Sequence, residues 1–258
     1  MSLPDHPGPD DLAAVEAIVR RAGALIMAIY GTDFAVRGKS DASPVTEADE
    51  QAEALIVPAL AALAPDVPIV AEEAVAAGRI PAVGDWFWLV DPLDGTKEFV
   101  SRNGEFTVNV ALVHRGEPVL GVVLAPALQR LFSGIAGQGA WIEEQGRRRP
   151  IHCRAVPSEG LTVVASRSHG DAAALDAFLA GRKVAAFAAA GSSLKLCLVA
   201  AGEADLYPRF GRTMEWDIAA GHAVLAAAGG RVLTLDGAPL RYAKPGFENP
   251  HFVASGMG

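Results

Sequence analysis

The chain has 258 residues, 51% of them hydrophobic, and a formal net charge of −8 at pH 7. This length suits one large domain or two closely packed smaller ones with an ample core. The acidic balance disfavours a nucleic-acid polymer as a partner, because phosphate backbones are bound by clustered lysine and arginine, but it leaves metal-mediated contact with phosphate groups open.

The first residues of the chain show no targeting signal. The segment MSLPDHPGPDD is acidic and proline-rich, without the basic start and apolar run of a signal peptide. No later stretch reaches the roughly twenty apolar residues that a membrane helix needs. Cys153 and Cys197 lie in dissimilar contexts without a CxxC motif, which indicates reduced structural thiols. We expect a cytoplasmic protein with no integral membrane segment and no obligatory protein partner, and peripheral association with the inner membrane stays open.

Two helices are expected in the first part of the chain. Apolar residues recur at helical spacing over residues 11–30, which predicts an amphipathic helix that ends at Gly31. Thr46 is a candidate N-cap of a second helix, because Asp49 follows three residues later as in a capping box. Pro58 is expected to kink or divide that second helix, because proline removes a backbone hydrogen bond.

Two short strands each end at acidic residues. Residues 68–71 form a strand candidate that ends at Glu72 and Glu73, and residues 74–85 have the composition of a loop. The run WFWLV then predicts a buried strand over residues 86–91, with an aspartate at its carboxyl end. The acidic residues therefore follow strands rather than lying on solvated helix faces.

After this strand, Pro92 is expected to lead the chain out of the sheet and into a short helix near residues 95–101. The next segment alternates short β-rich runs with turns, which predicts an antiparallel meander. Its runs are FTVNVALV, PVLGVVLA, RLFSGIA and GAWIEE. The basic run Arg147–Arg149 is interpreted as a solvated turn.

From about residue 160 onward, strand and helix patterns alternate, from LTVVAS through EWDIAAGHAVLAAAGG to RVLTL. We predict an α/β (α+β) protein made of two halves without a flexible linker. Residues 1–155 form an N-terminal α+β half that carries most of the acidic residues considered below. Residues 156–258 form a C-terminal α/β half.

The segment WLVDPLDGTKEF contains the most informative pair of carboxylates, Asp91 and Asp94. Two carboxylates this close raise each other's pKa unless a cation lies between them, and oxygen ligands of this kind suit Mg²⁺ or Mn²⁺. Gly95 and Thr96 follow at the start of a predicted helix, whose free N–H groups favour a phosphate. On the dipeptide alone, a tight turn at Asp94-Gly95 with Thr96 as a helix cap is the better interpretation.

A covalent phosphatase is a sharper alternative for the same segment. The nucleophile motif of haloacid-dehalogenase phosphatases also ends in Asp-Gly-Thr after an apolar strand, but its two aspartates are two residues apart. Residues two apart on an extended segment point the same way, whereas Asp91 and Asp94 are three apart with Pro92 between them. An aspartyl-phosphate intermediate is therefore disfavoured.

The remaining acidic sites each have an ordinary explanation when taken alone. Asp49 closes a capping box, Glu72-Glu73 is a solvated strand end, and Asp217 after Trp216 favours a helix dipole. Their order along the chain is harder to explain in these ordinary terms. The acidic sites form one series of motifs, VTEAD, EE, DPLDGT and then WD before Gly-Gly. This series resembles the inositol monophosphatase superfamily of lithium-sensitive, metal-dependent phosphomonoesterases. The resemblance covers roughly residues 40–255, and its longer phrases are most similar to bacterial 3′(2′),5′-bisphosphate nucleotidases of the CysQ type.

The resemblance implies a layered αβαβα sandwich of the inositol monophosphatase/fructose-1,6-bisphosphatase type, with two or three Mg²⁺ ions per active site and Mn²⁺ as a substitute. It implies that Glu72, Asp91 and the Leu93 carbonyl hold one ion, and that Asp91, Asp94 and Asp217 hold a second. Such a pair of cations suits in-line hydrolysis by water without a covalent intermediate.

The resemblance also implies roles in catalysis and binding. Glu72 and Thr96, with Asp49 behind Thr96, are expected to orient the attacking water. The implied substrate is a small phosphorylated nucleotide, adenosine 3′,5′-bisphosphate, which gives AMP and phosphate during sulfate assimilation. The residues expected to contact the substrate are Glu72, Leu93, Asp94, Gly95, Thr96, Ser193, Arg209 and Asp217.

The choice of substrate depends on weaker signals. Ser192, Ser193, Lys195, Arg209 and Arg212 are candidates for contacts with the base and the 5′-phosphate, although Lys195 is as well explained as an exposed helix residue.

Two other functions compete with the nucleotidase. An inositol monophosphatase or a sugar bisphosphatase of the same superfamily is the alternative enzyme, and the residues KEF after Thr96 favour the nucleotidase. A non-catalytic metal or phosphate sensor is disfavoured, because none of the metal-binding positions is replaced.

Overall fold

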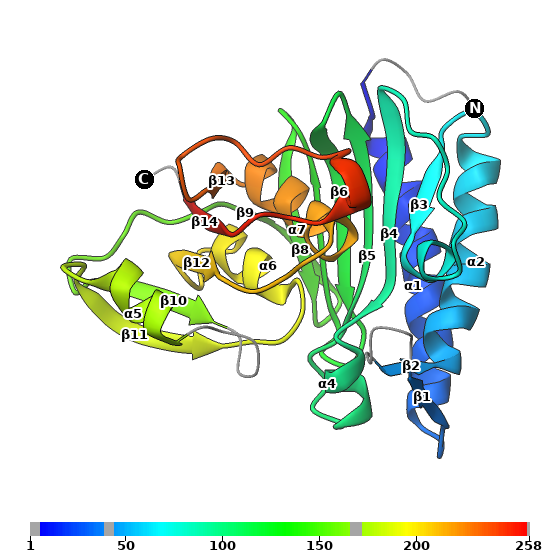
Figure 1. The fold of residues 1–258 in the computed structure, drawn as a ribbon, viewed down its shortest axis with the longest axis horizontal. Coiled ribbons are helices and arrows are strands. Elements are labelled where there is room, and N and C mark those ends of the chain that lie inside the picture. Colours follow the sequence, from blue (N-terminus) through cyan, green and yellow to red (C-terminus); the bar gives the residue numbers. More distant parts are fainter. Residues whose placement is uncertain (1–5, 39–43, 166–171, 257–258) are drawn as a thin grey trace.

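The computed structural model describes residues 6–38, 44–165 and 172–256. Two large sheets and the helices around them account for most of this part of the chain (Figure 1). A two-stranded ribbon, β1 (Val36–Gly38) with β2 (Pro44–Thr46), lies beside them.

The first sheet has seven strands in sequence order, β3 to β9. Only β3 and β4 run parallel, and every later neighbour is antiparallel, as the predicted meander requires. The strands are β3 (Ile69–Ala71), β4 (Trp86–Asp94), β5 (Thr107–His114), β6 (Glu117–Ala125), β7 (Arg130–Ile135), β8 (Gly139–Glu144) and β9 (Arg147–Ile151).

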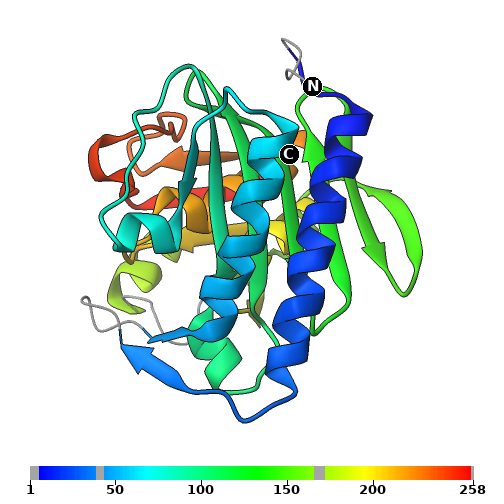
Figure 2. The same cartoon turned by 90° about the vertical axis from the view of Figure 1, so that its right-hand side faces the viewer.

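Two long helices cover one face of this sheet (Figure 2). Helix α1 (Pro9–Tyr30) and helix α2 (Glu47–Leu63) confirm the helices expected from apolar spacing and from the Thr46 N-cap. Their apolar stripes pack against alternate residues of β4, including Trp88 and Val90. Phe87 and Leu89, which alternate with them along the strand, belong to a different apolar cluster on the other face of the sheet.

The second sheet has five strands in the order β11-β10-β12-β14-β13. These strands are β10 (Leu161–Ala165), β11 (Val184–Ala189), β12 (Leu206–Arg209), β13 (Gly230–Thr234) and β14 (Phe252–Gly256). Adjacent residues of β10 again point to opposite faces. Val163 packs with Leu179 of α5 (Ala172–Leu179), whereas Val164 joins the cluster formed by the central helices.

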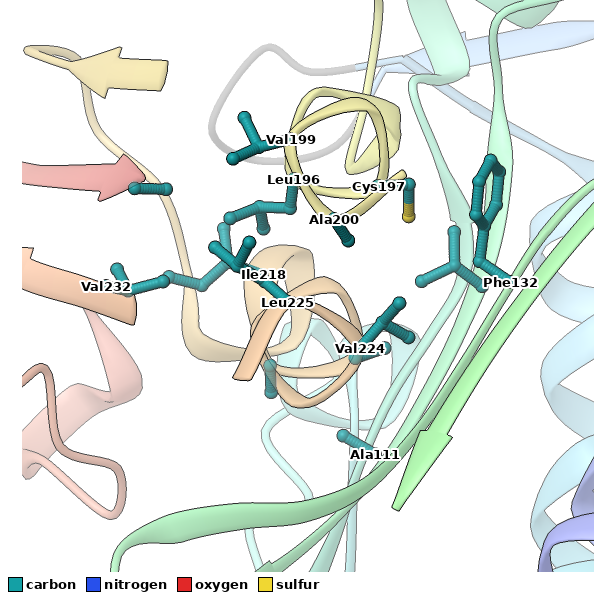
Figure 3. Close-up of a cluster of buried hydrophobic side chains, with 14 of the residues drawn as sticks. Ala111, Phe132, Leu196, Cys197, Val199, Ala200, Ile218, Val224, Leu225 and Val232 are labelled. Carbon is teal, nitrogen blue, oxygen red and sulfur yellow. The ribbon is translucent and has the colours of Figure 1, made fainter. Parts of the chain in front are cut away.

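The central layer consists of α6 (Leu194–Ala200) and α7 (Glu215–Ala227), which lie between the two sheets in Figure 1. Their apolar side chains face both sheets in Figure 3, with Phe132 on one side and Val232 on the other. The order of layers is therefore α1/α2, first sheet, α6/α7, second sheet and α5, which confirms the αβαβα sandwich.

Helix α7 lies unusually close to the first sheet because glycine faces it. A Cβ atom on Gly121 of β6 would collide with the carbonyl oxygen of Ala220, and a Cβ on Gly134 of β7 would lie 3.0 Å from Cα of Val224. Close packing at this distance leaves no room for a methyl group. The two glycines thereby determine how deeply α7 sits against the sheet.

Four local expectations need correction. Arg147–Arg149, expected as a solvated turn, belong to the exposed edge strand β9, which pairs with β8 and extends the sheet. Arg148 of this strand also forms an ion pair with Glu16 of α1. Residues 74–76 belong to the short helix α3 (Glu72–Ala76), where the expected loop begins later. Pro58 does not divide α2, which runs without a break from Glu47 to Leu63, and a kink at Pro58 stays a prediction. Finally, Pro92 does not end β4, which continues to Asp94.

Strand β14 was not expected from the sequence pattern. It pairs with both β12 and β13 and so joins the chain's last described residues to the second sheet. Strands up to Ile151 lie in the first sheet and strands from Leu161 in the second. The division into halves near residue 155 agrees with this change of sheet but stays a prediction, because α6 and α7 pack against both sheets.

Candidate active site

The parallel pair β3 and β4 brings the first two carboxylates together. Ala71 of β3 lies opposite Val90 of β4, so the residues that follow, Glu72 and Asp91, are neighbours at one sheet edge. The carboxyl groups of Glu72 and Asp91 are within hydrogen-bonding distance. Asp91 is only 1% exposed, and its Oδ1 accepts a hydrogen bond of 3.0 Å from the Leu93 N–H.

A β-bulge adds Asp94 to the same face. Asp91 lies opposite Asn109 of β5, and Asp94 lies opposite Thr107, so β4 has one residue more than β5 between the two pairs. Since Thr107 and Asn109 are two apart and share a face, Asp91 and Asp94 share it too. The expectation that the three-residue spacing separates these aspartates was wrong. The spacing argument against a covalent phosphatase therefore fails, and other observations must decide.

Asp217 reaches the site from the first turn of α7. Its Oδ2 accepts a hydrogen bond of 2.8 Å from the Met214 N–H, so Asp217 caps the helix at whose start its charge was expected to favour the helix dipole. It also interacts electrostatically with Glu72 and Asp94. The capping role and the proposed ligand role are therefore compatible in one side chain.

These residues line a cleft of about 410 Å³, whose walls come from residues 72–98 and 192–218. All the residues expected to bind metal or substrate border it, which the order of motifs along the chain did not guarantee. They are Glu72, Asp91, Leu93, Asp94, Gly95, Thr96, Ser193, Arg209 and Asp217.

Three aspartates of this cleft, Asp91, Asp94 and Asp217, have raised pKa values. Burial, followed by the charges of Glu72, Asp94 and Asp217, raises the pKa of Asp91 well above its usual range. Burial and the charges of Asp94 and Glu72 do the same to the pKa of Asp217. Burial raises the pKa of Asp94 to about 6, against the opposing effects of the Lys195 charge and the Ser193 N–H. Asp94 and Asp217 keep part of their surface open to the cleft, so their burial is incomplete.

The donor set fits a hard divalent cation. Carboxylate and carbonyl oxygens are the ligands that Mg²⁺ prefers, and a cation would remove the repulsion that raises these pKa values. Within the described residues, no three acidic, histidine or cysteine side chains already converge into a complete set of ligands.

Asp49 and Thr96 form a hydrogen-bonded pair at the edge of the cleft. Asp49 is 1% exposed, and its Oδ2 accepts from both the N–H and the hydroxyl of Thr46, at 2.8 and 2.7 Å. Its Oδ1 accepts from the Thr96 hydroxyl at 3.1 Å. Because Thr96 donates its proton to Asp49, its oxygen has a lone pair available for a water molecule. Asp49 thus closes the expected capping box and also orients Thr96.

Gly95 begins α4 (Thr96–Val100), which confirms the expected short helix. Its backbone has a φ of 87°, a left-handed conformation that favours glycine. A Cβ at this position would lie 3.2 Å from Oε2 of Glu98 and 3.4 Å from Cβ of Ser192. The left-handed backbone, more than the space around it, therefore favours glycine here.

Ser193 and Lys195 occupy positions that the sequence did not reveal. The Ser193 N–H donates to Asp94 Oδ2 at 2.6 Å, and its hydroxyl donates to Asn109 Oδ1 at 2.7 Å. Lys195 is only 4% exposed, so its interpretation as an exposed helix residue was wrong. Its Nζ donates to the carbonyls of Ser192 and Ala190, at 2.5 and 3.3 Å, and lies over the Tyr207 ring. Ser193 as a substrate contact stays a prediction.

The two arginine candidates lie farther along the cleft wall. Arg209 donates to the Arg212 carbonyl at 3.0 Å and lowers the pKa of Asp217. Arg212 is exposed and pairs with Glu248. Phe106, which carries a stackable ring, instead packs against Tyr30 in the core.

Sequence reasoning missed two polar residues on β5, Thr107 and Asn109. Both are fully or almost fully buried, at 0% and 1% exposure, and both contact Ser193. The signal was present in the run FTVNV, where two polar residues alternate with valines. Such alternation places both on one face of a strand.

Comparisons with known proteins agree with one another. The sequence pattern described as the inositol monophosphatase family matches residues 9–254. The chain is 48% identical over 241 residues to the 3′(2′),5′-bisphosphate nucleotidase CysQ of Escherichia coli strain K12, covering 92% of this chain and 96% of that protein.

Solved structures give the same result. The fold is similar to CysQ from Bacteroides thetaiotaomicron, with a TM-score of 0.79, 37% identity and coverage of 96% of this chain and 98% of that one. It is also similar to the Thermotoga maritima IMPase, with a TM-score of 0.78, 31% identity and coverage of 95% and 92%.

Proposed function

Because the chain belongs to the inositol monophosphatase family, we propose that it is a metal-dependent 3′(2′),5′-bisphosphate nucleotidase that converts adenosine 3′,5′-bisphosphate to AMP and phosphate. The observation that carries this proposal is the 48% identity, over nearly the whole chain, to a CysQ nucleotidase. The carboxylate cleft supports it, because the residues assigned to the metals border one cavity.

We assign the metal ligands as the sequence predicts. Glu72, Asp91 and the Leu93 carbonyl would hold one Mg²⁺, and Asp91, Asp94 and Asp217 a second. The neighbouring positions of Glu72 and Asp91 and the bulge at Asp94 support this assignment. When bound, such ions supply Lewis acidity that activates water and stabilises a departing oxygen. Two or three ions per site, and Mn²⁺ as a substitute, stay part of the proposal.

The chain's own residues would orient the reacting groups. Thr96, with its proton directed to Asp49, accepts a hydrogen bond from the attacking water, and Glu72 takes the proton that this water loses. The N–H groups of Gly95 and Thr96 bind oxygens of the phosphate. A direct attack of this kind places water, rather than Asp91, on phosphorus. In this assignment Asp91 serves as a ligand of both ions and not as the nucleophile.

Arg209 supports a substrate with a second phosphate. It lines the cleft and its charge acts on Asp217, so it would attract the second anionic group of a bisphosphate bound in the same cleft. Inositol 1-phosphate has no second anionic group. An inositol monophosphatase or sugar bisphosphatase of the same family is the alternative function.

A parallel assay tests the substrate. Phosphate release is measured from adenosine 3′,5′-bisphosphate, inositol 1-phosphate and fructose 1,6-bisphosphate, with Mg²⁺ and with or without Li⁺. We expect kcat/KM to be at least about tenfold higher for the nucleotide, and turnover to fall in Li⁺. A preference for either of the other substrates would overturn the nucleotidase proposal.

The variant Asp94→Asn tests the two-metal assignment. Loss of one ligand charge should weaken binding of the second ion and lower turnover strongly while the fold is kept. Near-normal turnover of this variant at limiting Mg²⁺ would contradict the assignment.

The cellular setting has less support. Within residues 6–38, 44–165 and 172–256, no helix has the length and apolar character to cross a membrane. A cytoplasmic location and the lack of an obligatory protein partner stay predictions.

A further inference from the structure

A buried polar network joins strand β5 to the start of α6 beside Asp94. Its members are Thr107, Asn109 and Ser193, with exposures of 0%, 1% and 3%. Burying polar groups costs free energy unless their hydrogen bonds are made. Valines alternate with Thr107 and Asn109 along the same strand, so an apolar residue would suit the strand itself equally well. The presence of polar side chains at Thr107 and Asn109 is therefore not explained by the strand alone.

The contacts of this network end on one oxygen of Asp94. The Ser193 N–H donates to Asp94 Oδ2 at 2.6 Å, and Asn109 Nδ2 donates to the same oxygen at 3.4 Å. The other end of the Asn109 amide, Oδ1, accepts from the Ser193 hydroxyl at 2.7 Å. Thr107 Oγ1 lies 2.9 Å from the Ser193 hydroxyl and makes no hydrogen bond to Asp94. Asn109 is thus the side chain that connects Ser193 to the carboxylate.

Both donors bond the same oxygen of Asp94, Oδ2. Among the described residues, none donates a hydrogen bond to the second oxygen, Oδ1. An amide and a backbone N–H fix the direction of a carboxylate without neutralising its charge. A lysine or arginine in the same place would pair with the carboxylate and compete with a cation, whereas Lys195, the nearby cation whose charge acts on Asp94, donates to the carbonyls of Ala190 and Ser192. A neutral donor therefore suits a carboxylate that is held in one orientation but must stay available to a metal.

We propose that Asn109 is a positioning residue for the metal site, which holds Asp94 through Oδ2 and leaves Oδ1 for the cation, with Ser193 locking the Asn109 amide. The inference rests on one part of the proposed function, that Asp94 binds a divalent ion. Ser193 lies 84 residues from Asn109 and 99 from Asp94. Because Ser193 is the N-cap of α6, the orientation of Asp94 on the first sheet depends on the position of α6 against that sheet.

The direct test measures Mn²⁺ binding to the full-length protein by calorimetry, without substrate. In Asn109→Ala the carboxylate loses one donor and Ser193 loses its acceptor. Removal of a residue that orients a metal ligand typically costs ten- to a hundredfold in metal affinity. We expect the weaker Mn²⁺ site of Asn109→Ala to bind about tenfold less tightly.

Thr107→Val is the matched control. Valine is nearly the same size as threonine, and the change removes a contact with Ser193. Thr107 lies opposite Asp94 across the sheet, but its hydroxyl makes no hydrogen bond to Asp94, so both hydrogen bonds to Asp94 Oδ2 are kept. Its Mn²⁺ affinity should stay within about twofold of the wild type, even if its urea midpoint falls as far as that of Asn109→Ala. Equal loss of Mn²⁺ affinity in both variants would show a merely structural network and overturn the inference.

Ser193→Ala provides a second measurement, which decides the matter if Asn109→Ala does not fold. This variant keeps the N–H that donates to Asp94 but releases the Asn109 amide, so we expect an intermediate loss of about threefold. Unchanged Mn²⁺ affinity in a folded Asn109→Ala, or in Ser193→Ala when only that variant folds, would contradict the inference.

The same measurements separate this inference from the proposed function. If the wild type does not hydrolyse adenosine 3′,5′-bisphosphate but Asn109→Ala weakens Mn²⁺ binding, the substrate assignment fails and the positioning role holds. If the wild type is a nucleotidase and Mn²⁺ affinity is unchanged in the variant, the positioning role fails alone. As an additional readout, turnover of Asn109→Ala should fall more at limiting than at saturating Mg²⁺.

Discussion

Two carboxylates in the first turn of α7 meet opposite surroundings. Glu215 is 0% exposed, and its oxygens accept from the N–H groups of Ala243 and Lys244 and from the Lys244 ammonium, at 2.9, 2.9 and 2.6 Å. Asp217, two residues later, accepts a hydrogen bond from the Met214 N–H and interacts with the charges of Asp94 and Glu72 across the cleft, which the Arg209 charge only partly offsets. The same helix end therefore carries one acid in a buried ion pair and one acid among other carboxylates.

The contrast separates a structural charge from a functional one. A buried carboxylate with a complementary cation and two N–H donors is satisfied by the protein itself, and its loss leaves those donors unpaired. Clustered carboxylates without such partners destabilise the metal-free fold and favour a bound cation. Removal of an acid should thus have opposite consequences in the two places.

The largest expected effect is on catalysis, in Asp91→Asn. This change removes the carboxylate that would contact both ions, so several kcal/mol of transition-state stabilisation are lost. We expect turnover to fall by about a thousandfold, which corresponds to about 4 kcal/mol. Steady-state phosphate release at saturating Mg²⁺ measures this effect.

The same variant should not lose stability. With EDTA present, urea unfolding of Asp91→Asn should give an unfolding free energy equal to or above that of the wild type, because a repelled charge has been removed. A clear loss of stability would show that Asp91 is needed for folding and would weaken the contrast with Glu215.

The next largest effect is expected for Glu215→Ala, which leaves the Lys244 ammonium and two N–H groups without their acceptor. Breaking a buried pair of this kind costs about 3 kcal/mol of unfolding free energy. Urea unfolding in EDTA measures the loss. Glu248→Ala, which removes an exposed ion pair with Arg212, is the control and should change stability by less than about 1 kcal/mol. A similar, small effect in both variants would contradict the structural role of Glu215.

A smaller effect is expected from pH. Because burial raises the folded-state pKa of Asp94 to about 6, the folded protein holds this proton more tightly than the unfolded chain does. The unfolding free energy should therefore fall as pH rises from about 4 to 7, by about 2 kcal/mol from this group. The fall should be reduced in Asp94→Asn, and saturating Mg²⁺ should oppose it in the wild type. Unfolding in EDTA at several pH values tests this; identical slopes in the two proteins would exclude the assigned cause.

The smallest effect on stability is expected for Tyr242→Phe. The Tyr242 ring lies under the ammonium of Lys244, the partner of Glu215, and these residues with His222 form the Glu215 cluster. The Tyr242 hydroxyl lies 2.9 Å from Nδ1 of His222, whose pKa is lowered to about 3, first by burial and then by the Lys244 charge. The imidazole is neutral at pH 7, so a neutral hydrogen bond is lost at a cost of about 1 kcal/mol. Thermal unfolding measures this, and phosphate release should be unchanged. A marked drop in turnover would indicate coupling between this cluster and the active site.

Much of the fold and of the candidate site was accessible to sequence reasoning. Apolar spacing predicted α1, and the Thr46 to Asp49 spacing predicted the start of α2, because helices are encoded by near neighbours. The carboxylates were recognised by residue type and order, and the structure gathers them at one cleft. These features need little knowledge of what lies opposite in space.

The errors occurred where distant residues decide. Pro92 was expected to end its strand, but pairing with β5 continues to Asp94 across the bulge. Lys195 was as readily an exposed residue as a buried one, because its burial depends on Tyr207 and the turn at Ser192. Asn109 was passed over because its alternation with Thr107 and the valines shows only which strand face it occupies, and no spacing along the chain shows its partner Ser193.

The sequence by itself thus determined the set of acidic residues, their order, and the helices and most of the strands that carry them, since these depend on residue chemistry and local periodicity. Only the tertiary structure decided which side each carboxylate faces and what holds it. The bulge sets Asp91 and Asp94 on one face through cross-strand register, and Ser193 reaches Asp94 from 99 residues away. Register and layer packing are properties of segments brought together by folding, so no local pattern specifies them.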